Sequence, residues 1–328
     1  MLRKFGGPDG FAVVECPVPE PGPGEVLVKV LAASVQFTDV MLRKGRYPDL
    51  KEKPPLVLGY DLVGEVVKLG PGVTSVSVGQ RVADLTVTGC YAQYRTLKAD
   101  RVTLVDAALD PAEATSLVLS WMTAYQLLHR EAKVQKGQAI LVIGAAGAVG
   151  QALVVLGRLA GCDVWGAVRG RHLNTVHQLG ASPVDSERQD YARVRPGGFD
   201  VVFDGIAEQG FTRGWHAVGP RGYLAAFGVS AGIQGDASIV RLGLWLARLW
   251  WWNMVSGGRS TSFFSITSLR KKHPDLFVAD LRQLFGLMAR GEIMPRVAER
   301  ISFNAVADAH TRLERGGLDG KIVLLPNG

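Results

Sequence analysis

The chain has 328 residues, of which 47% are hydrophobic and 20% charged, and its formal net charge is +7 at pH 7. This composition is typical of a globular protein with two domains, and no apolar run reaches the roughly 18 residues that a membrane span needs. The N-terminus lacks the pattern of a signal peptide, and the sparse cysteines Cys16, Cys90 and Cys162 form neither a disulfide framework nor a CxxC zinc motif, so we expect a cytoplasmic protein.

The first 110 residues are rich in β-strand signals. Strand-like runs are found at residues 26–30, 62–67, 76–82 and 91–97, and glycine-proline turns such as Gly70-Pro71-Gly72 separate them. Many short strands joined by such turns predict a compact barrel.

The pattern changes after Asp110. Residues 111–128 are predicted to form one helix, with Asp110 as its cap and Pro111 at its first position. Buried strands are then predicted at residues 139–143, 163–168, 200–204 and 223–227, with helices at 148–160 and around 175–179. This alternation predicts a doubly wound parallel sheet. Helices at 276–290 and 306–313 and a strand at 321–325 close the chain.

A glycine-rich turn follows the strand at residues 139–143. Gly144, Gly147 and Gly150 stand at three-residue spacing before an apolar helix, which is a variant of the dinucleotide-binding fingerprint. Small residues let the backbone approach a pyrophosphate, and the helix directs its free N–H groups at the phosphates. This interpretation is favoured over a turn that serves packing alone. The expected contacts with the cofactor are Gly144, Ala146, Gly147, Ala148 and Val149.

The next strand carries the information on cofactor choice. An enzyme that binds NAD places an acid at the end of this strand, whereas this chain has Arg169 and Arg171 there and Asp163 at the opposite end. Guanidinium groups suit a 2′-phosphate, so we predict NADPH in preference to a solvent-facing loop of fortuitous arginines. The remaining basic residues are scattered, which favours a solvated surface over a nucleic-acid partner.

Taken together, several segments resemble the quinone oxidoreductase (zeta-crystallin-like) branch of the medium-chain dehydrogenases/reductases. They are Phe5-Gly6-Gly7-Pro8, residues 21–28, 32–41, 45–48, 59–64 and 119–125, the glycine turn, and residues 320–324. The resemblance implies a mixed α/β fold in which residues 1–112 and 266–328 form a GroES-like β-barrel catalytic domain. Residues 113–265 would form a Rossmann domain that binds NADPH, and a homodimer is implied.

The resemblance also shows which zinc ligands are missing. Zinc alcohol dehydrogenases have a cysteine where this chain has Gln36 and a His-Glu pair where it has Tyr60-Asp61, and near their four-cysteine lobe only Cys90 is found. Without thiolate or imidazole ligands we expect no metal. Relatives usually have asparagine at the position of Gln36, so the substrate-site geometry is expected to differ.

The implied reaction is hydride transfer to a small carbonyl substrate, a quinone or an α,β-unsaturated carbonyl compound. By resemblance, Tyr47 stabilises or protonates the developing oxygen anion, Gln36 is an amide donor to the carbonyl, and Tyr60 is a third candidate. Each has a structural alternative, an amide bonded within the fold for Gln36 and aromatic packing for the tyrosines; Asp39 is expected to be a structural acid. The resemblance places four more residues at the cofactor: Thr123, Phe227, Gly228 and Lys321.

Residues 242–252 are unusual because they contain four of the seven tryptophans. The segment is too short to span a bilayer, and a substrate lid or a dimer contact is favoured over an interfacial membrane helix. Two other functions stay open. One is a specialised enoyl or ketone reductase of secondary, polyketide-type metabolism; the other is an NADPH-binding protein whose role is binding and not catalysis.

Overall fold

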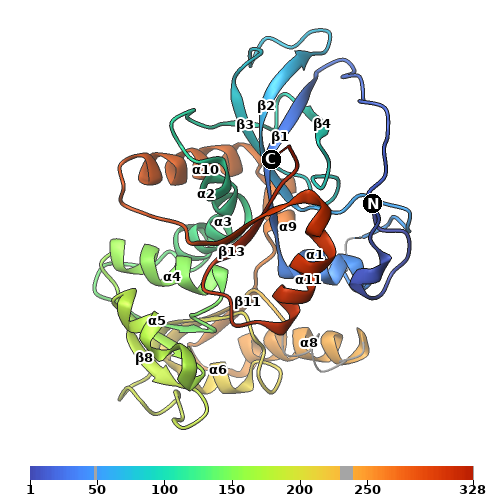
Figure 1. Ribbon diagram of the computed structural model, residues 1–328. Helices are drawn as coiled ribbons and strands as arrows, with labels where there is room; N and C mark the ends of the chain where they lie inside the picture. The colour runs from blue at the N-terminus through green and yellow to red at the C-terminus, as the bar shows by residue number, and fades with distance from the viewer. Residues whose placement is uncertain (48–49, 230–238, 328) are drawn as a thin grey trace. The chain divides into compact units, whose positions relative to one another are not determined.

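The computed structural model describes residues 1–47, 50–229 and 239–327 and divides into two compact units. The first unit comprises Met1–Met122 and His273–Gly328, and the second comprises Thr123–Lys272 (Figure 1). The boundaries expected from the sequence, after residues 112 and 265, fall earlier than these. Helix α2 (Pro111–Ser116) belongs with the first unit because the Thr115 hydroxyl donates to the Ala32 carbonyl of a central strand, at 3.3 Å.

The first unit is built on a seven-stranded sheet in the order β12-β13-β1-β2-β3-β5, with β4 paired to β1. Its strands are β1 (Glu25–Val35), β2 (Asp61–Leu69), β3 (Arg81–Leu85), β4 (Tyr94–Lys98), β5 (Thr103–Leu104), β12 (Val297–Ser302) and β13 (Lys321–Leu325). The antiparallel pairing of β1 with β13 joins the two ends of the chain, and it sets Val35 opposite Ile322. This register brings Gln36, just after β1, close to Lys321 at the start of β13.

The helices of the first unit are α1 (Phe37–Arg43), α2, α10 (Pro274–Ala289) and α11 (Val306–Arg315), with the short turns η1 (Pro8–Gly10), η2 (Leu117–Trp121) and η5 (Phe303–Ala305). Helix α1 is capped by Asp39, whose carboxylate accepts from the backbone N–H of Gln36 at 2.9 Å, while the Asp39 N–H donates to the Gln36 backbone carbonyl at 3.0 Å. The expected structural role of Asp39 is therefore visible in the cap.

Two predicted elements of this region are wrong in detail. Residues 77–80 form a turn, since the Gln80 N–H bonds the Ser77 carbonyl, so the strand predicted at 76–82 starts only at Arg81. The helix predicted at 111–128 does begin after Asp110, whose carboxylate accepts from the Glu113 N–H at 2.9 Å. It is not one regular helix, because π-helical turns at η2 and η3 (Leu127–Glu131) interrupt it on either side of α3 (Met122–Gln126).

The second unit confirms the prediction of a doubly wound parallel sheet. Its six strands are β6 (Ala139–Ile143), β7 (Asp163–Val168), β8 (Ser182–Asp185), β9 (Phe199–Asp204), β10 (Val218–Ala226) and β11 (Ser260–Phe263), in the order β11-β10-β9-β6-β7-β8. All of their pairings are parallel. The order reverses between β6 and β9, and such a switch point is where ligands bind in sheets of this kind.

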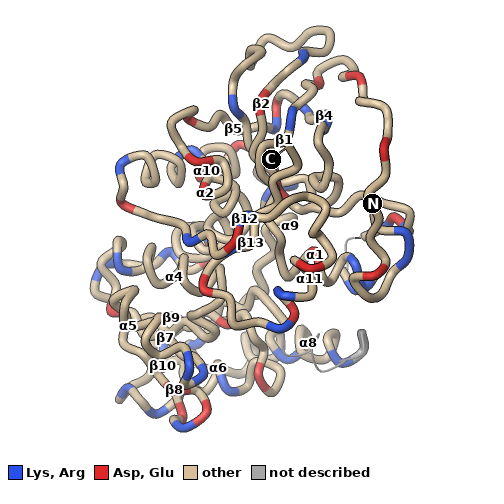
Figure 2. Tube along the Cα trace, in the orientation of Figure 1, with Lys and Arg blue, Asp and Glu red and all other residues tan. Residues whose placement is uncertain are grey.

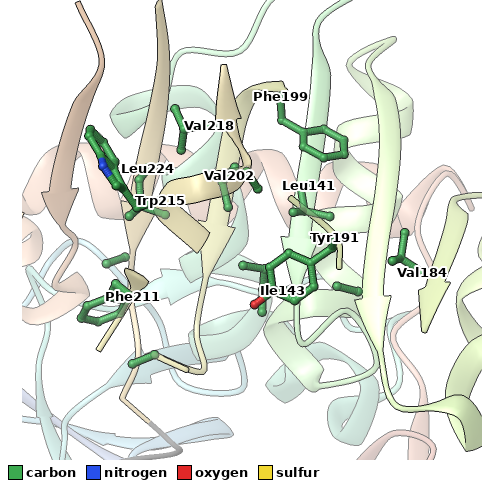
Figure 3. Packing of buried hydrophobic residues seen from close by; sticks show 14 of the residues in the cluster. Leu141, Ile143, Val184, Tyr191, Phe199, Val202, Phe211, Trp215, Val218 and Leu224 are labelled. Atoms are coloured by element: carbon green, nitrogen blue, oxygen red, sulfur yellow. The ribbon is translucent and has the colours of Figure 1, made fainter. Parts of the chain in front are cut away.

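Helices and one short turn connect these strands: α4 (Ala148–Leu159), η4 (Gly170–His172), α5 (Leu173–Gln178), α6 (Thr212–Ala217), α8 (Ile239–Val255) and α9 (Ile266–Lys272). One apolar cluster forms the core between helices and sheet. Figure 3 shows Leu141, Val202 and Leu224 projecting from neighbouring strands, with Trp215 and Tyr191 near them. Strands buried on both faces read as continuous apolar runs, which explains why β6 and β7 match their predicted ranges.

Candidate active site

Two tyrosines of the first unit meet through their hydroxyl groups. Tyr47 follows α1 and Tyr60 immediately precedes β2; their hydroxyl oxygens are 2.6 Å apart and their rings pack edge to face. The Tyr60 side chain is buried, and that of Tyr47 is partly exposed. Only one hydroxyl can donate within the pair, so the proton of the other can be directed to a third group. The structure thus brings together two residues that the sequence suggested separately.

A second polar cluster of this unit surrounds Gln36. Its amide nitrogen donates to the Ser34 hydroxyl and to the Asp61 carboxylate, both at 2.6 Å. Its amide oxygen accepts from the ammonium of Lys321 and from the Ser120 hydroxyl at 3.3 Å. All four hydrogen-bonding positions of the amide are used within the fold. The contacts match the alternative in which Gln36 is bonded internally, not a donor waiting for a substrate carbonyl.

The cluster holds ionisable groups that are almost completely shielded from solvent. Burial raises the pKa of Asp61 to about 6, although Lys321 and the Ser34 hydrogen bonds oppose the rise. Burial together with the charge of Asp61 raises the pKa of Asp39 to about 8. Burial lowers the pKa of Lys321 to about 8, with both aspartates opposing the change. These groups therefore gain or lose protons nearer neutral pH than exposed carboxylates and amines do.

Lys321 was expected to contact the cofactor, and Asp61, Ser34 and Ser120 were not singled out. The structure places the Lys321 ammonium on Gln36, with only 7% of the residue exposed. Asp61 lies in a segment that was used for its resemblance alone. No local pattern shows that it faces Gln36, because the contact depends on the β1–β2 pairing.

The glycine turn of the second unit lies at the carboxyl end of β6. Gly144 has a positive φ of 81°, which few other residues adopt, and a methyl group at Gly150 would lie only 2.3 Å from the Gly144 carbonyl oxygen. Gly147 begins α4 with no side chain capping it. The first N–H groups of α4 are thus left for a ligand, as an anion site at a helix N-terminus requires. Gln151, which the sequence did not suggest, braces the turn by donating to the Ala146 carbonyl at 2.9 Å.

The residues after β7 form an exposed basic loop. Arg169 caps the short turn η4, and the Arg171 guanidinium bonds the ring of His172 at 3.0 Å. Within the described part of the chain, neither guanidinium forms a salt bridge with a carboxylate, so both can receive an anion. The Glu187 carboxylate faces the loop and accepts from the Gly170 N–H at 3.3 Å. The sequence did not suggest this acid.

Other expected cofactor residues lie at the same edge of the second sheet. Phe227 and Gly228 follow β10, where the Phe227 N–H donates to the Asp204 carbonyl at 3.0 Å and both residues pack against Gly205. Ile206, in the same β9 loop, packs against Gly144. These contacts bring the carboxyl ends of β6, β9 and β10 together. Thr123 is a buried residue of α3 for which the structure gives no partner among these groups.

The described residues contain neither a metal-binding cluster nor a helix that could span a membrane. Among the residues that the structure describes, no group of three or more His, Cys, Asp or Glu side chains is arranged to hold a metal ion. No helix in the ranges 1–47, 50–229 and 239–327 is both long and apolar enough to cross a membrane.

Comparisons with known proteins agree with this architecture. Residues 22–107 match the family model of the alcohol dehydrogenase GroES-like domain, and residues 179–324 match that of zinc-binding dehydrogenases. The chain is 31% identical to a 2-haloacrylate reductase of Burkholderia sp, over 99% of this chain and 98% of that protein. It is 30% identical to a phthioceranic/hydroxyphthioceranic acid synthase of Mycobacterium bovis, over 84% of this chain but 13% of the synthase. The solved structure of Escherichia coli quinone oxidoreductase complexed with NADPH has a TM-score of 0.88 at 25% identity, covering 99% of this chain and 98% of that one.

A GroES-like unit and a Rossmann-like unit with a glycine turn define an oxidoreductase of the dinucleotide-binding class. The chain belongs to the medium-chain dehydrogenase/reductase family, in its quinone oxidoreductase-like branch.

Proposed function

We propose that this protein reduces a quinone or an α,β-unsaturated carbonyl compound by hydride transfer from NADPH, without zinc. The observation that carries the proposal is the hydrogen-bonded pair Tyr47–Tyr60, because Tyr60 stands where zinc enzymes of the family have a ligand. A phenol pair can polarise an oxygen, as zinc does in those enzymes, and it can also supply a proton.

The second unit is proposed to bind the cofactor. Its glycine turn has the close backbone approach that a pyrophosphate needs, and Arg169 and Arg171 suit a 2′-phosphate. We assign cofactor contacts to Gly144, Ala146, Gly147, Ala148, Val149, Arg169, Arg171, Thr123, Phe227 and Gly228. The NADPH in the related Escherichia coli structure supports this assignment.

The first unit is proposed to act on the substrate. Bound NADPH supplies the hydride to an electron-poor carbon. Tyr47 donates its hydroxyl proton toward the oxygen that becomes negative, and Tyr60 holds the Tyr47 hydroxyl by donating to it. Gln36 is a positioning residue that fixes Lys321 and Asp61, and not a group that touches the carbonyl.

One specific observation favours a specialised enoyl reductase as a second candidate. The synthase of Mycobacterium bovis matches this chain at 30% identity across a segment that is only 13% of its own length. A unit of this type inside a large synthase would act on an enoyl group carried by that synthase. In this candidate the same tyrosine pair serves an acyl substrate.

The first test is titration of the purified protein with NADPH and with NADH, followed by cofactor oxidation against small quinones, enones and enoyl thioesters. Tight NADPH binding with turnover of quinones or enones would support the proposal. Turnover of thioesters alone would favour the second candidate, and tight NADPH binding without any turnover would favour a binding role. A preference for NADH would contradict the assignment of Arg169 and Arg171.

A homodimer acting in the cytoplasm on a small substrate, with no nucleic-acid partner, completes the proposal. It rests on the family resemblance, and sedimentation equilibrium of the purified protein tests the dimer.

A further inference from the structure

Helix α8 (Ile239–Val255) is firmly attached to the second unit along one side. Leu249 is buried, and Trp252 stacks on Trp215 with ring centroids 4.8 Å apart and planes 3° from parallel. Trp245 packs edge to face on Phe211. These contacts fix which side of the helix faces away from the core.

The opposite side of α8 is a continuous apolar surface, which we call the outer face of α8. The exposed fractions are 66% for Trp250, 54% for Trp251 and 58% for Met254. At 100° per residue these side chains and their apolar neighbours cover about half of the helix circumference. The outer face consists of Leu244, Leu246, Trp250, Trp251, Met254 and Val255. An exposed patch of this kind is unusual on a monomer and indicates an interaction site.

The charged residues of helix α8 itself are all basic. Helix α8 contains no acidic residue, and its two charged residues, Arg241 and Arg248, are seven positions apart and so lie along one edge of the outer face. Figure 2 shows this helix with basic segments only, at the lower end of the second unit. The Arg248 guanidinium donates to two neutral acceptors, the Gln209 carbonyl at 3.0 Å and the Thr212 hydroxyl at 2.8 Å.

The charge of the whole chain is concentrated in this unit. Residues 123–272 contain 17 Lys and Arg against 9 Asp and Glu, a net charge of +8, whereas the rest of the chain has 20 against 21, a net charge of −1. A unit of net charge +8 is attracted to a negatively charged surface.

We propose that the outer face of α8 docks on the surface of an anionic lipid bilayer. Tryptophan prefers the boundary between water and hydrocarbon, and arginine at the edge of an apolar face reaches the lipid phosphates. Binding then combines burial of apolar side chains with charge attraction, as in other interfacial helices. The homodimer proposed above rests on the family resemblance, so a subunit contact through the outer face of α8 is the competing outcome that the test distinguishes.

The test is flotation of the full-length protein with phosphatidylcholine vesicles, with and without phosphatidylserine. We expect binding only when phosphatidylserine is present, and weaker binding at high salt. The double variant Trp250→Ser/Trp251→Ser should bind at least about tenfold more weakly, and Arg241→Gln about fivefold more weakly. Leu159→Ser is the matched control, because Leu159 is an exposed apolar residue of the same unit outside α8.

Titration with NADPH shows whether each variant keeps a folded second unit, and sedimentation velocity measures self-association. The proposal is overturned if the wild-type protein does not float with phosphatidylserine vesicles, or if the tryptophan variant floats as well as Leu159→Ser. Self-association that Trp250→Ser/Trp251→Ser abolishes, without vesicle binding by the wild type, would identify the face as a subunit contact instead.

Discussion

The two units of this protein differ in net charge and in how many ionisable groups they bury. The first unit has almost no net charge, yet it buries Asp39, Asp61, Lys321, Arg43 and His310, all with at most 7% of the residue exposed. The second unit carries a net charge of +8 but encloses an apolar core, and Asp204 is its one fully shielded acid among the described residues. The difference matches the proposed division of work. Proton-handling groups need shielding from water, whereas an anionic cofactor needs exposed cations and bare backbone.

Pairing supports the burial of three of these groups. The Arg43 guanidinium forms an ion pair with Glu314, which also binds Lys44, and Lys321 and Asp61 share the amide of Gln36. Removing one member of such a set leaves the others uncompensated, and this is more costly than the net worth of the pair. In the second unit the sensitive positions are instead those where no side chain fits.

The largest effect is therefore expected at Gly150. In Gly150→Ala the added methyl group would lie 2.3 Å from the Gly144 carbonyl oxygen and 2.7 Å from the Ala145 Cα, and both are backbone atoms that cannot rotate away. We expect about 3 kcal/mol or more of destabilisation and loss of NADPH binding, measured by urea unfolding and cofactor titration. Gly243→Ala is the control: it is also helical, has open space around it, and should gain up to about 1 kcal/mol. Equal effects at both positions would show that the turn geometry is unimportant.

The next largest effect concerns the tyrosine pair. Tyr47→Phe keeps the ring but removes the hydroxyl that bonds Tyr60, so kcat/KM should fall about a hundredfold or more while NADPH affinity is unchanged. Tyr60→Phe removes only the supporting hydroxyl and should cost less. Near-normal turnover by Tyr47→Phe would exclude this residue from the mechanism.

The buried His310 makes the first unit sensitive to acid. Burial, with a smaller contribution from Arg43, lowers the pKa of His310 from 6.5 to about 3. Because the folded state resists protonation, stability from this residue is complete above pH 6.5 and is lost as the pH falls toward 3. At pH 5 the loss should be about 2 kcal/mol in the free energy of unfolding.

The comparison with His310→Phe isolates this effect, because Phe11 and Tyr91 already surround the position with aromatic rings. Urea unfolding between pH 7 and pH 5 should show a shallower decline in the variant. Parallel declines in both proteins would mean that other groups govern the acid sensitivity.

A loss of stability is also expected when Gln36 is replaced. Gln36→Leu leaves the Lys321 ammonium and the Asp61 carboxylate without their shared amide, and should lower the free energy of unfolding by about 2 kcal/mol. Gln36→Asn restores the amide that relatives usually have, one methylene shorter, and should lose less. Equal stability of Gln36→Leu and the wild-type protein would show that Lys321 and Asp61 can pair directly.

These positions also show what could be predicted from the sequence. The strands Ala139–Ile143, Asp163–Val168 and Lys321–Leu325 match their predicted ranges, because each is an apolar run within a recognisable pattern. The strand predicted at residues 76–82 is mostly turn, since alternating residues in a turn look like a strand. The family resemblance identified Gln36 and Lys321 separately and gave them separate roles.

The contacts themselves depend on tertiary pairing, which no local pattern contains. Gln36 meets Lys321 only because β1 pairs with β13 across most of the chain, and Asp61 joins them through β2. Tyr47 and Tyr60 lie near opposite ends of the connection between α1 and β2, and their hydrogen bond could not be inferred from their spacing. Glu187 approaches the basic loop because β8 lies beside β7, a neighbour relation that only the sheet order reveals.

The smallest and most selective effect is expected on cofactor affinity, at the basic loop that Glu187 faces. Arg169→Ala/Arg171→Ala should weaken NADPH binding about tenfold and leave NADH binding almost unchanged, because the arginines are proposed to contact only the 2′-phosphate. Glu187→Gln should act in the opposite direction and tighten NADPH binding slightly, since its carboxylate now faces the same loop. Fluorescence titration with both cofactors measures these changes. If Glu187→Gln instead weakens NADH binding, Glu187 is the ribose ligand of an NAD site. The positive charge of the second unit would then not serve a 2′-phosphate.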